Sequence, residues 1–87
     1  MFTGIIEEVG KINQVTKTNR TISIKVGSNK VIKKIKLGSS VAVNGVCLTV
    51  VKKGRQLFTA DLMPETINIT TFKNISKYKI VNLEASL

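Results

Sequence analysis

Residues 39–50 read SSVAVNGVCLTV and place the step Asn44-Gly45 between two runs of small and β-branched residues. A type I′ turn needs a positive φ at both of its central residues, and Asn-Gly is the pair that adopts it most readily. The stretch therefore predicts a β-hairpin with its turn at residues 43–46. Counting outward from the turn gives the expected cross-strand pairs: Val43 with Val46, Ala42 with Cys47, Val41 with Leu48, and Ser40 with Thr49.

The predicted register gives the hairpin two different faces, because side chains alternate with a period of two along a strand. One face is bulky and carries Val41, Val43, Val46, Leu48 and Val50. The other face is small and mildly polar and carries Ser40, Ala42, Cys47 and Thr49. Short hydroxyl and thiol groups leave room above them and favour a flat polar ligand. The alternative interpretation is an ordinary strand face that lies under a helix or faces solvent.

The chain has 87 residues, of which 43% are hydrophobic. A single domain of this length buries only about 60–65% of the surface of its unfolded chain, so a partner subunit would add stability. No apolar run reaches the ~20 residues of a membrane span, and the N-terminus lacks the basic and apolar regions of a signal peptide. We expect one soluble, cytoplasmic domain over residues 1–87 with no membrane contact.

One cysteine and no histidine exclude several kinds of site within the chain. A lone thiol forms no internal disulfide, and a cysteine-based zinc site needs further Cys or His ligands. Nucleophilic catalysis by a Ser-His or Cys-His pair also requires a histidine. We therefore expect neither a metal site nor a hydrolytic triad.

Fourteen Lys and Arg against five Asp and Glu give a net charge of +9, which raises nucleic acid as a partner. The basic residues are spread along the chain, apart from one cluster in residues 29–36, NKVIKKIK. There Val31, Ile32 and Ile35 have the spacing of a short helix with one apolar stripe and a cationic outer side. Because stacking aromatics are few, we interpret the basic face as solvated and expect no nucleic acid. A small basic barrel that binds RNA or single-stranded DNA is the alternative.

The remaining segments predict further strands. Residues 4–15 form one strand with a bulge or bend at Gly10. Residues 21–26 and 56–63 alternate apolar and polar positions. Their expected inward residues are Ile22, Ile24, Val26, Phe58, Ala60 and Leu62.

The last part of the chain changes its pattern at Pro64. Proline followed by Glu65 predicts the start of a helix of about two turns. Residues 77–84 form the final strand, with Tyr78, Ile80, Val81 and Leu83 as its apolar candidates. Six short strands at close spacing predict an all-β, closed or nearly closed antiparallel barrel with one or two short helices.

Three long stretches resemble one known family: MFTGIIEEVG at residues 1–10, SVAVNGVCLTV at 40–50 and FTADLMPETINITT at 58–71. They resemble the N-terminal lumazine-binding domain of riboflavin synthase, and VNLE at 81–84 is similar to that domain's last strand. The resemblance implies a six-stranded Greek-key barrel that holds one 6,7-dimethyl-8-ribityllumazine or riboflavin molecule. In the family, two tandem barrels form an enzyme that is usually a trimer. It dismutates two lumazines to riboflavin and 5-amino-6-(ribitylamino)uracil without a cofactor.

The resemblance also implies the residues of the site. Carried over by position, the ligand-binding residues are Gly4, Ile5, Ile6, Ser40, Cys47, Leu48, Thr49, Asp61, Leu62, Met63, Pro64, Glu65 and Thr66. Ser40 and Cys47 are the catalytic candidates, as nucleophile or base, and Phe2 with Thr3 would cover the site. Alternatives remain at three positions: an inert buried thiol at Cys47, a solvent-facing strand residue at Asp61 and a simple helix-start residue at Thr66.

The chain ends where the family continues into a Gly-Gly-His segment and a second barrel. The resemblance therefore implies a domain that binds its ligand but is weakly active or inactive alone. Two copies would pair as a homo-oligomer that imitates the two barrels of the enzyme. A non-catalytic lumazine or flavin carrier is the alternative function.

Overall fold

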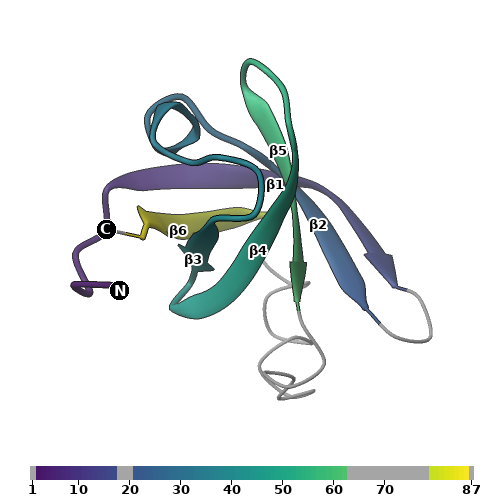
Figure 1. Cartoon of the computed structure of the whole chain (residues 1–87), viewed down its shortest axis with the longest axis horizontal. Helices are drawn as coiled ribbons and strands as arrows, with labels where there is room; N and C mark the ends of the chain where they lie inside the picture. The colour runs from purple at the N-terminus through teal and green to yellow at the C-terminus, as the bar shows by residue number, and fades with distance from the viewer. Residues whose placement is uncertain (1, 18–20, 63–78, 87) are drawn as a thin grey trace.

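The computed structural model describes residues 2–17, 21–62 and 79–86. Within these ranges the chain forms six β-strands and one short 3-10 helix (Figure 1). The helix, η1, spans Val31–Lys33. The strands are β1 (Glu8–Lys17), β2 (Ile22–Gly27), β3 (Ser40–Val43), β4 (Val46–Lys53), β5 (Leu57–Leu62) and β6 (Ile80–Ala85).

The turn between β3 and β4 is the predicted one. Asn44 has a φ of 50° and Gly45 a φ of 80°, so both central residues adopt the left-handed region that a type I′ turn requires. The four expected cross-strand pairs are all present. The Asn44 side chain also links the hairpin to β6, because its Oδ1 accepts a hydrogen bond from the Asn82 N–H at 2.7 Å.

The strands close into a barrel in the order β1-β2-β5-β4-β3-β6, and every neighbouring pair is antiparallel. β3, β4 and β5 form a meander, with β2 beside β5 and β6 beside β3. In this order two strands lie between β2 and β3, and two lie between β5 and β6, which is a Greek-key arrangement. Figure 1 shows the strands wrapped around a common interior. The predicted six-stranded antiparallel barrel is confirmed.

The interior is filled by the inward residues of β2 to β6, and Ile12 and Val15 of β1 pack against them. The predicted inward positions of β2 and β5 are correct. Ile24, Val26, Phe58, Ala60 and Leu62 are each at most 1% exposed, and Ile22 packs against this core.

The η1 segment also contributes to the core. Val31, Ile32 and Ile35 are buried, while Lys33 and Lys34 point to solvent. The predicted apolar stripe and cationic outer side of this segment are therefore confirmed. The helix itself spans only Val31–Lys33, so Ile35 lies beyond its end.

Two predictions for β1 are wrong. The strand begins at Glu8 rather than at Gly4, and its register shift lies between Ile12 and Gln14 rather than at Gly10. Gly10 has a different role, which is close packing. A Cβ at this position would lie 2.5 Å from Leu83 Cδ1 and 2.8 Å from the Gly27 carbonyl oxygen. A glycine in a strand indicates either a bulge or a close approach, and here it is the approach.

The apolar candidates of the last strand divide between its two faces. Val81 and Leu83 are buried as predicted, whereas Ile80 is 64% exposed and is not an inward residue. The faces follow from pairing with β1, which places Gly10 opposite Val81 and Lys11 opposite Ile80. Tyr78 and the helix predicted from Pro64 lie outside the described residues.

Glu8 holds the loop between β2 and η1. Its carboxylate accepts hydrogen bonds from Ser28 Oγ at 2.6 Å and from the N–H groups of Asn29, Lys30 and Val31 at 2.6, 3.1 and 2.9 Å. Partial burial alone would raise the pKa of Glu8, but these four donors outweigh it and lower the pKa from 4.5 to about 2. The carboxylate thus satisfies main-chain donors that precede and open η1.

Residues 2–7 form an arm that lies along β6. Glu84, which is 8% exposed, accepts hydrogen bonds from the Thr3 N–H at 2.6 Å, the Thr3 hydroxyl at 2.9 Å and the Gly4 N–H at 3.1 Å. At the other end of the arm, Glu7 Oε1 accepts from the Ala85 N–H at 2.9 Å. A buried carboxylate needs such donors, so Glu84 and the arm stabilise each other.

We expect Glu8→Gln to lower the free energy of unfolding by about 1–3 kcal/mol at pH 7, since hydrogen bonds to a charged acceptor are lost. Because the folded-state pKa of Glu8 is depressed to about 2, its contribution is complete above about pH 4.5 and disappears as the pH falls toward 2. Urea unfolding at pH 7 and pH 3 should therefore show a smaller difference between the two proteins at pH 3. The surface substitution Lys11→Gln is the control, and equal stability of the Glu8 variant and the parent at pH 7 would contradict the assignment.

Glu84→Gln should loosen the arm, because the negative charge is lost and one of the two acceptor oxygens becomes an NH2 group, which cannot accept from Thr3 or Gly4. We expect faster hydrogen exchange at these two amides, while the amides of β4 and β5 keep their protection. Thr3→Ala is the matched control, since it removes one of the three donors and should have a smaller effect. Unchanged exchange at Gly4 in the Glu84 variant would show that the carboxylate does not hold the arm.

Candidate functional site

The outer face of the barrel carries a line of polar residues that come from four different strands. Ser40 on β3 pairs with Thr49 on β4, Thr49 pairs with Asp61 on β5, and Asp61 pairs with Ser23 on β2. Directly opposed residues have Cβ atoms about 4.5–5.5 Å apart, so neighbours in this line are within reach of one another. We call these four half-buried residues the polar row. Thr16 of β1 continues it, opposite Ser23.

A second line of outward residues lies two positions further along β3 and β4 and continues to β6. Cys47 pairs with Ala42, and Ala42 pairs with Glu84. The Cys47 side chain is exposed, whereas Ala42 is 5% exposed. Beside Ala42, the arm and the strands enclose a small cavity of about 90 Å³, which is lined by Gly4, Ile6, Ala42, Gly45, Asn82, Leu83 and Glu84.

These two lines bring together the predicted site residues of the hairpin and of β5. Ser40, Cys47, Thr49 and Asp61 all lie on the outer face, and the small face predicted for the hairpin is confirmed as an outward one. Cys47 is not the buried thiol of the alternative interpretation, because its side chain is exposed.

The other predicted residues have different positions. Leu48 and Leu62 are each 1% exposed and point into the core, so a ligand on the outer face would meet only their main chain. In the arm, Gly4 is bound to Glu84, while Ile5 and Ile6 are 68% and 54% exposed. Met63, Pro64, Glu65 and Thr66 lie outside the described residues.

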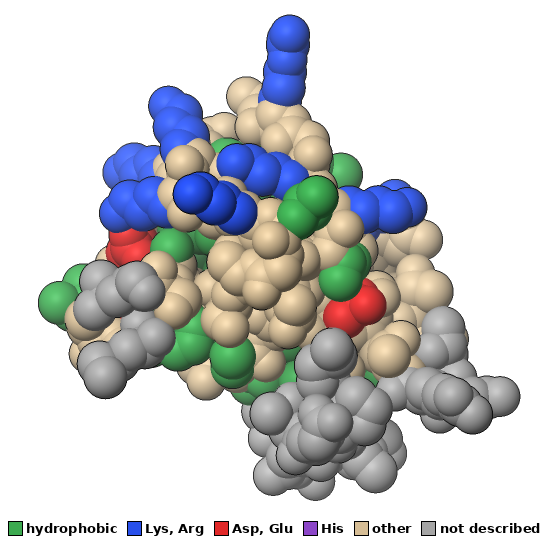
Figure 2. Space-filling view, in the orientation of Figure 1, with side chains coloured by type: hydrophobic (Ala, Val, Ile, Leu, Met, Phe, Trp, Pro, Cys, Tyr) green, Lys and Arg blue, Asp and Glu red, His purple; other side chains and the backbone are tan. Residues whose placement is uncertain are grey.

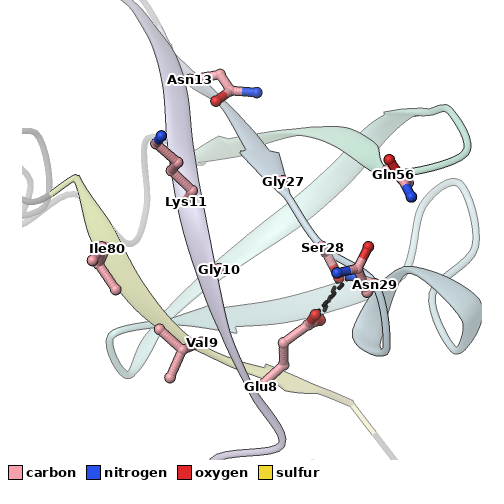
Figure 3. Close-up of a pocket in the computed structure, with 10 residues that line it drawn as sticks. All are labelled: Glu8, Val9, Gly10, Lys11, Asn13, Gly27, Ser28, Asn29, Gln56 and Ile80. Carbon is pink, nitrogen blue, oxygen red and sulfur yellow. Dashed lines mark hydrogen bonds between the residues drawn. The ribbon is translucent and has the colours of Figure 1, made fainter.

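A larger depression of about 450 Å³ lies elsewhere on the barrel, over β1 and the end of β2 (Figure 3). It contains none of the predicted site residues. Its acidic group, Glu8, already accepts the hydrogen bonds of the loop before η1, one of which Figure 3 draws. The lining residues are Glu8, Val9, Gly10, Lys11, Asn13, Gly27, Ser28, Asn29, Gln56 and Ile80.

Basic side chains gather in the upper half of the face shown in Figure 2, which corresponds to η1 and the β4–β5 hairpin in Figure 1. Two lysines, Lys34 directly after η1 and Lys53 at the end of β4, have partners within the chain. Lys34 Nζ forms an ion pair with Glu7, which lowers the pKa of that carboxyl by a charged hydrogen bond, and Lys53 Nζ donates to the Ile35 carbonyl at 2.9 Å.

Neither a membrane-spanning helix nor a cluster of metal ligands is present in the described residues. No helix there is long and apolar enough to cross a membrane. No group of three or more His, Cys, Asp or Glu side chains is placed to hold a metal ion in the same part of the chain.

Sequence reasoning missed two residues of this face, Ser23 and Glu84. Alternation in TISIKV points the Ser23 side chain away from the face that carries Ile22 and Ile24. That Asp61 is its partner can be known only from the pairing of β2 with β5. Similarly, VNLE places Glu84 outward, but nothing local indicates that Thr3 and Gly4 lie over it.

Comparisons with known proteins identify the family of the chain. The family model named lumazine binding domain matches residues 3–86. Riboflavin synthases of Actinobacillus pleuropneumoniae and Bacillus amyloliquefaciens are 45% and 44% identical over 87 residues, which is all of this chain and 40% of each relative. The riboflavin synthase of Chlamydia muridarum is 37% identical, and the chain covers 43% of it. The chain thus spans about two-fifths of the length of these relatives, and it belongs to the lumazine-binding domain family.

Proposed function

We propose that the chain binds 6,7-dimethyl-8-ribityllumazine or riboflavin on the outer face of β3, β4 and β5, as one barrel of a riboflavin synthase. The observation that carries this proposal is the alignment of Ser40, Thr49 and Asp61 across three adjacent strands, with Cys47 beside them. Ser40, Thr49 and Asp61 lie on three different strands, yet they present their polar groups on one surface.

The polar groups suit such a ligand. A lumazine or flavin ring presents carbonyl acceptors and a ring N–H, and its ribityl chain presents several hydroxyl groups. The hydroxyls of Ser40 and Thr49 both donate and accept, while the carboxylate of Asp61 accepts only. The small side chains of Ala42 and Cys47 leave room for a flat ring above β3 and β4.

For the dismutation, one lumazine must lose a methyl proton to a base while the other is attacked at an electrophilic ring carbon. Cys47 and Ser40 are the groups of the described face suited to these roles, and the four-carbon unit passes between the two lumazines without a cofactor. The second lumazine would be held by another barrel, since the relatives are about two and a half times as long as this chain.

Exposed apolar side chains support association with a second barrel. Ile5, Ile6, Val9 and Ile80 are 54–68% exposed, although large apolar residues are usually covered. We propose that the chain works as part of an oligomer, in the cytoplasm, where the thiol of Cys47 stays reduced.

A carrier that binds lumazine or flavin without turning it over is the second candidate. One barrel of this kind supplies a site for one ligand, while dismutation needs two lumazines. Turnover by the chain, rather than ligand binding, distinguishes the two functions.

Riboflavin added to the 87-residue chain should lose fluorescence in a saturable titration with a micromolar dissociation constant. Thr49→Ala should weaken binding about two- to tenfold, which is the effect of one lost hydrogen bond. Thr59→Ala is the matched control, because Thr59 lies on β5 two residues from Asp61 and pairs with Lys25 and Lys52 instead. No saturable binding by the parent chain would overturn the proposal, and binding of oligonucleotides that weakens with salt would support the basic-barrel alternative.

Cys47→Ser tests the catalytic assignment. We expect riboflavin formation from 6,7-dimethyl-8-ribityllumazine to fall at least about tenfold, as for loss of a positioned nucleophile or base, while the affinity for riboflavin changes less than about twofold. The Thr59→Ala variant again serves as the control. Equal turnover by parent and variant would exclude a catalytic thiol, whereas measurable turnover by the parent would exclude the carrier.

A further inference from the structure

Ser23 is the member of the polar row that the proposed function leaves without a role. It lies on β2 between the inward residues Ile22 and Ile24, so its own side chain points outward. Its Cα partner on β5 is Asp61, and its hydroxyl donates a hydrogen bond to Asp61 Oδ1. The two side chains therefore form a pair on the surface that the ligand is proposed to use.

The hydrogen bond restrains a carboxylate that would otherwise be free to rotate. Asp61 is half-buried, and a short side chain at such a position can turn toward solvent when nothing holds it. With Oδ1 bound to Ser23 on one side, Oδ2 keeps its capacity to accept. Thr49 lies opposite Asp61 on the other side, on β4, so a ligand that contacts Thr49 lies beside Asp61.

An ionised carboxylate distinguishes the two parts of the proposed ligand. The ring edge of a flavin or lumazine presents one N–H between two carbonyl oxygens, and those oxygens would repel a carboxylate placed there. The ribityl chain presents only hydroxyl groups, each of which donates to a carboxylate without such repulsion. Asp61 thus fits the polyol better than the ring.

We propose that Ser23 is a positioning residue that holds Asp61 to receive a ribityl hydroxyl, and so makes the site selective for ligands with a polyol chain. This inference rests on the proposed function, because it needs a lumazine or flavin on this face. It adds a residue of β2 to a site that was expected only on the arm, β3, β4, β5 and the segment after β5.

The test compares two flavins that share the ring: riboflavin, and lumiflavin, in which a methyl group replaces the ribityl chain. Fluorescence titrations are made with the parent chain and with Ser23→Ala. We expect Ser23→Ala to weaken riboflavin about three- to tenfold and to leave lumiflavin within about twofold. Ser23→Thr keeps a hydroxyl at this position and should restore most of the lost affinity.

A second comparison shows whether Ser23 acts through Asp61. In an Asp61→Ala background, Ser23→Ala should have no further effect on riboflavin, since there is no carboxylate left to position. Circular dichroism and thermal unfolding of each variant confirm that the barrel is intact.

Three results would overturn the inference while the proposed function stands. These are an equal loss of lumiflavin and riboflavin affinity, a full effect of Ser23→Ala in the Asp61→Ala background, and riboflavin binding unchanged by Ser23→Ala. If the parent chain binds neither flavin, the proposed function fails and the inference fails with it.

Discussion

Closure of the barrel depends on the close approach of β1 to β6 at Gly10. β1 pairs with β6 over residues 8–11 and with β2 over residues 11–17, so one strand joins the two ends of the sheet. At the point where it passes from one partner to the other, Gly10 packs against Leu83 and the Gly27 carbonyl with no room for a Cβ. A six-stranded barrel is strongly curved, and this strand accommodates the curvature with a glycine and then with a register shift between Ile12 and Gln14.

The few acidic residues stabilise the structure, although the chain has a large positive net charge. Each carboxylate in the described part of the chain accepts a hydrogen bond from within the protein: Glu7, Glu8, Asp61 and Glu84. Three of them bind main-chain N–H groups: Glu8 those of the loop before η1, Glu84 those of the arm, and Glu7 that of Ala85 at the end of β6. The described lysines lie at the surface, so the excess positive charge is on the exterior of the barrel. The carboxylates instead connect segments of the chain to one another.

Local features were predictable from the sequence, and features that depend on distant pairing were not. The β3–β4 register follows from Asn44-Gly45 because a two-residue turn determines which residues face each other. The inward residues of β2 and β5 follow from alternation. By contrast, β2 and β5 are separated by two strands in the sequence, so no local pattern could show that Ser23 lies opposite Asp61. The arm was predicted as strand because GIIEEV is rich in β-branched residues, although a buried carboxylate on β6 binds it instead.

The contacts of the same arm can form only late in synthesis. Thr3 and Gly4 leave the ribosome well before their partner Glu84, which is 81 and 80 positions later in the sequence. Contacts of such large sequence separation form slowly, since the intervening chain must be ordered before they gain anything. The arm must therefore wait in the nascent chain until β6 has emerged and paired with β3, and the cavity beside Ala42 is assembled last. A pause in translation before residue 80 would leave β1 and β3 without their shared partner β6, and the arm would have no carboxylate to bind.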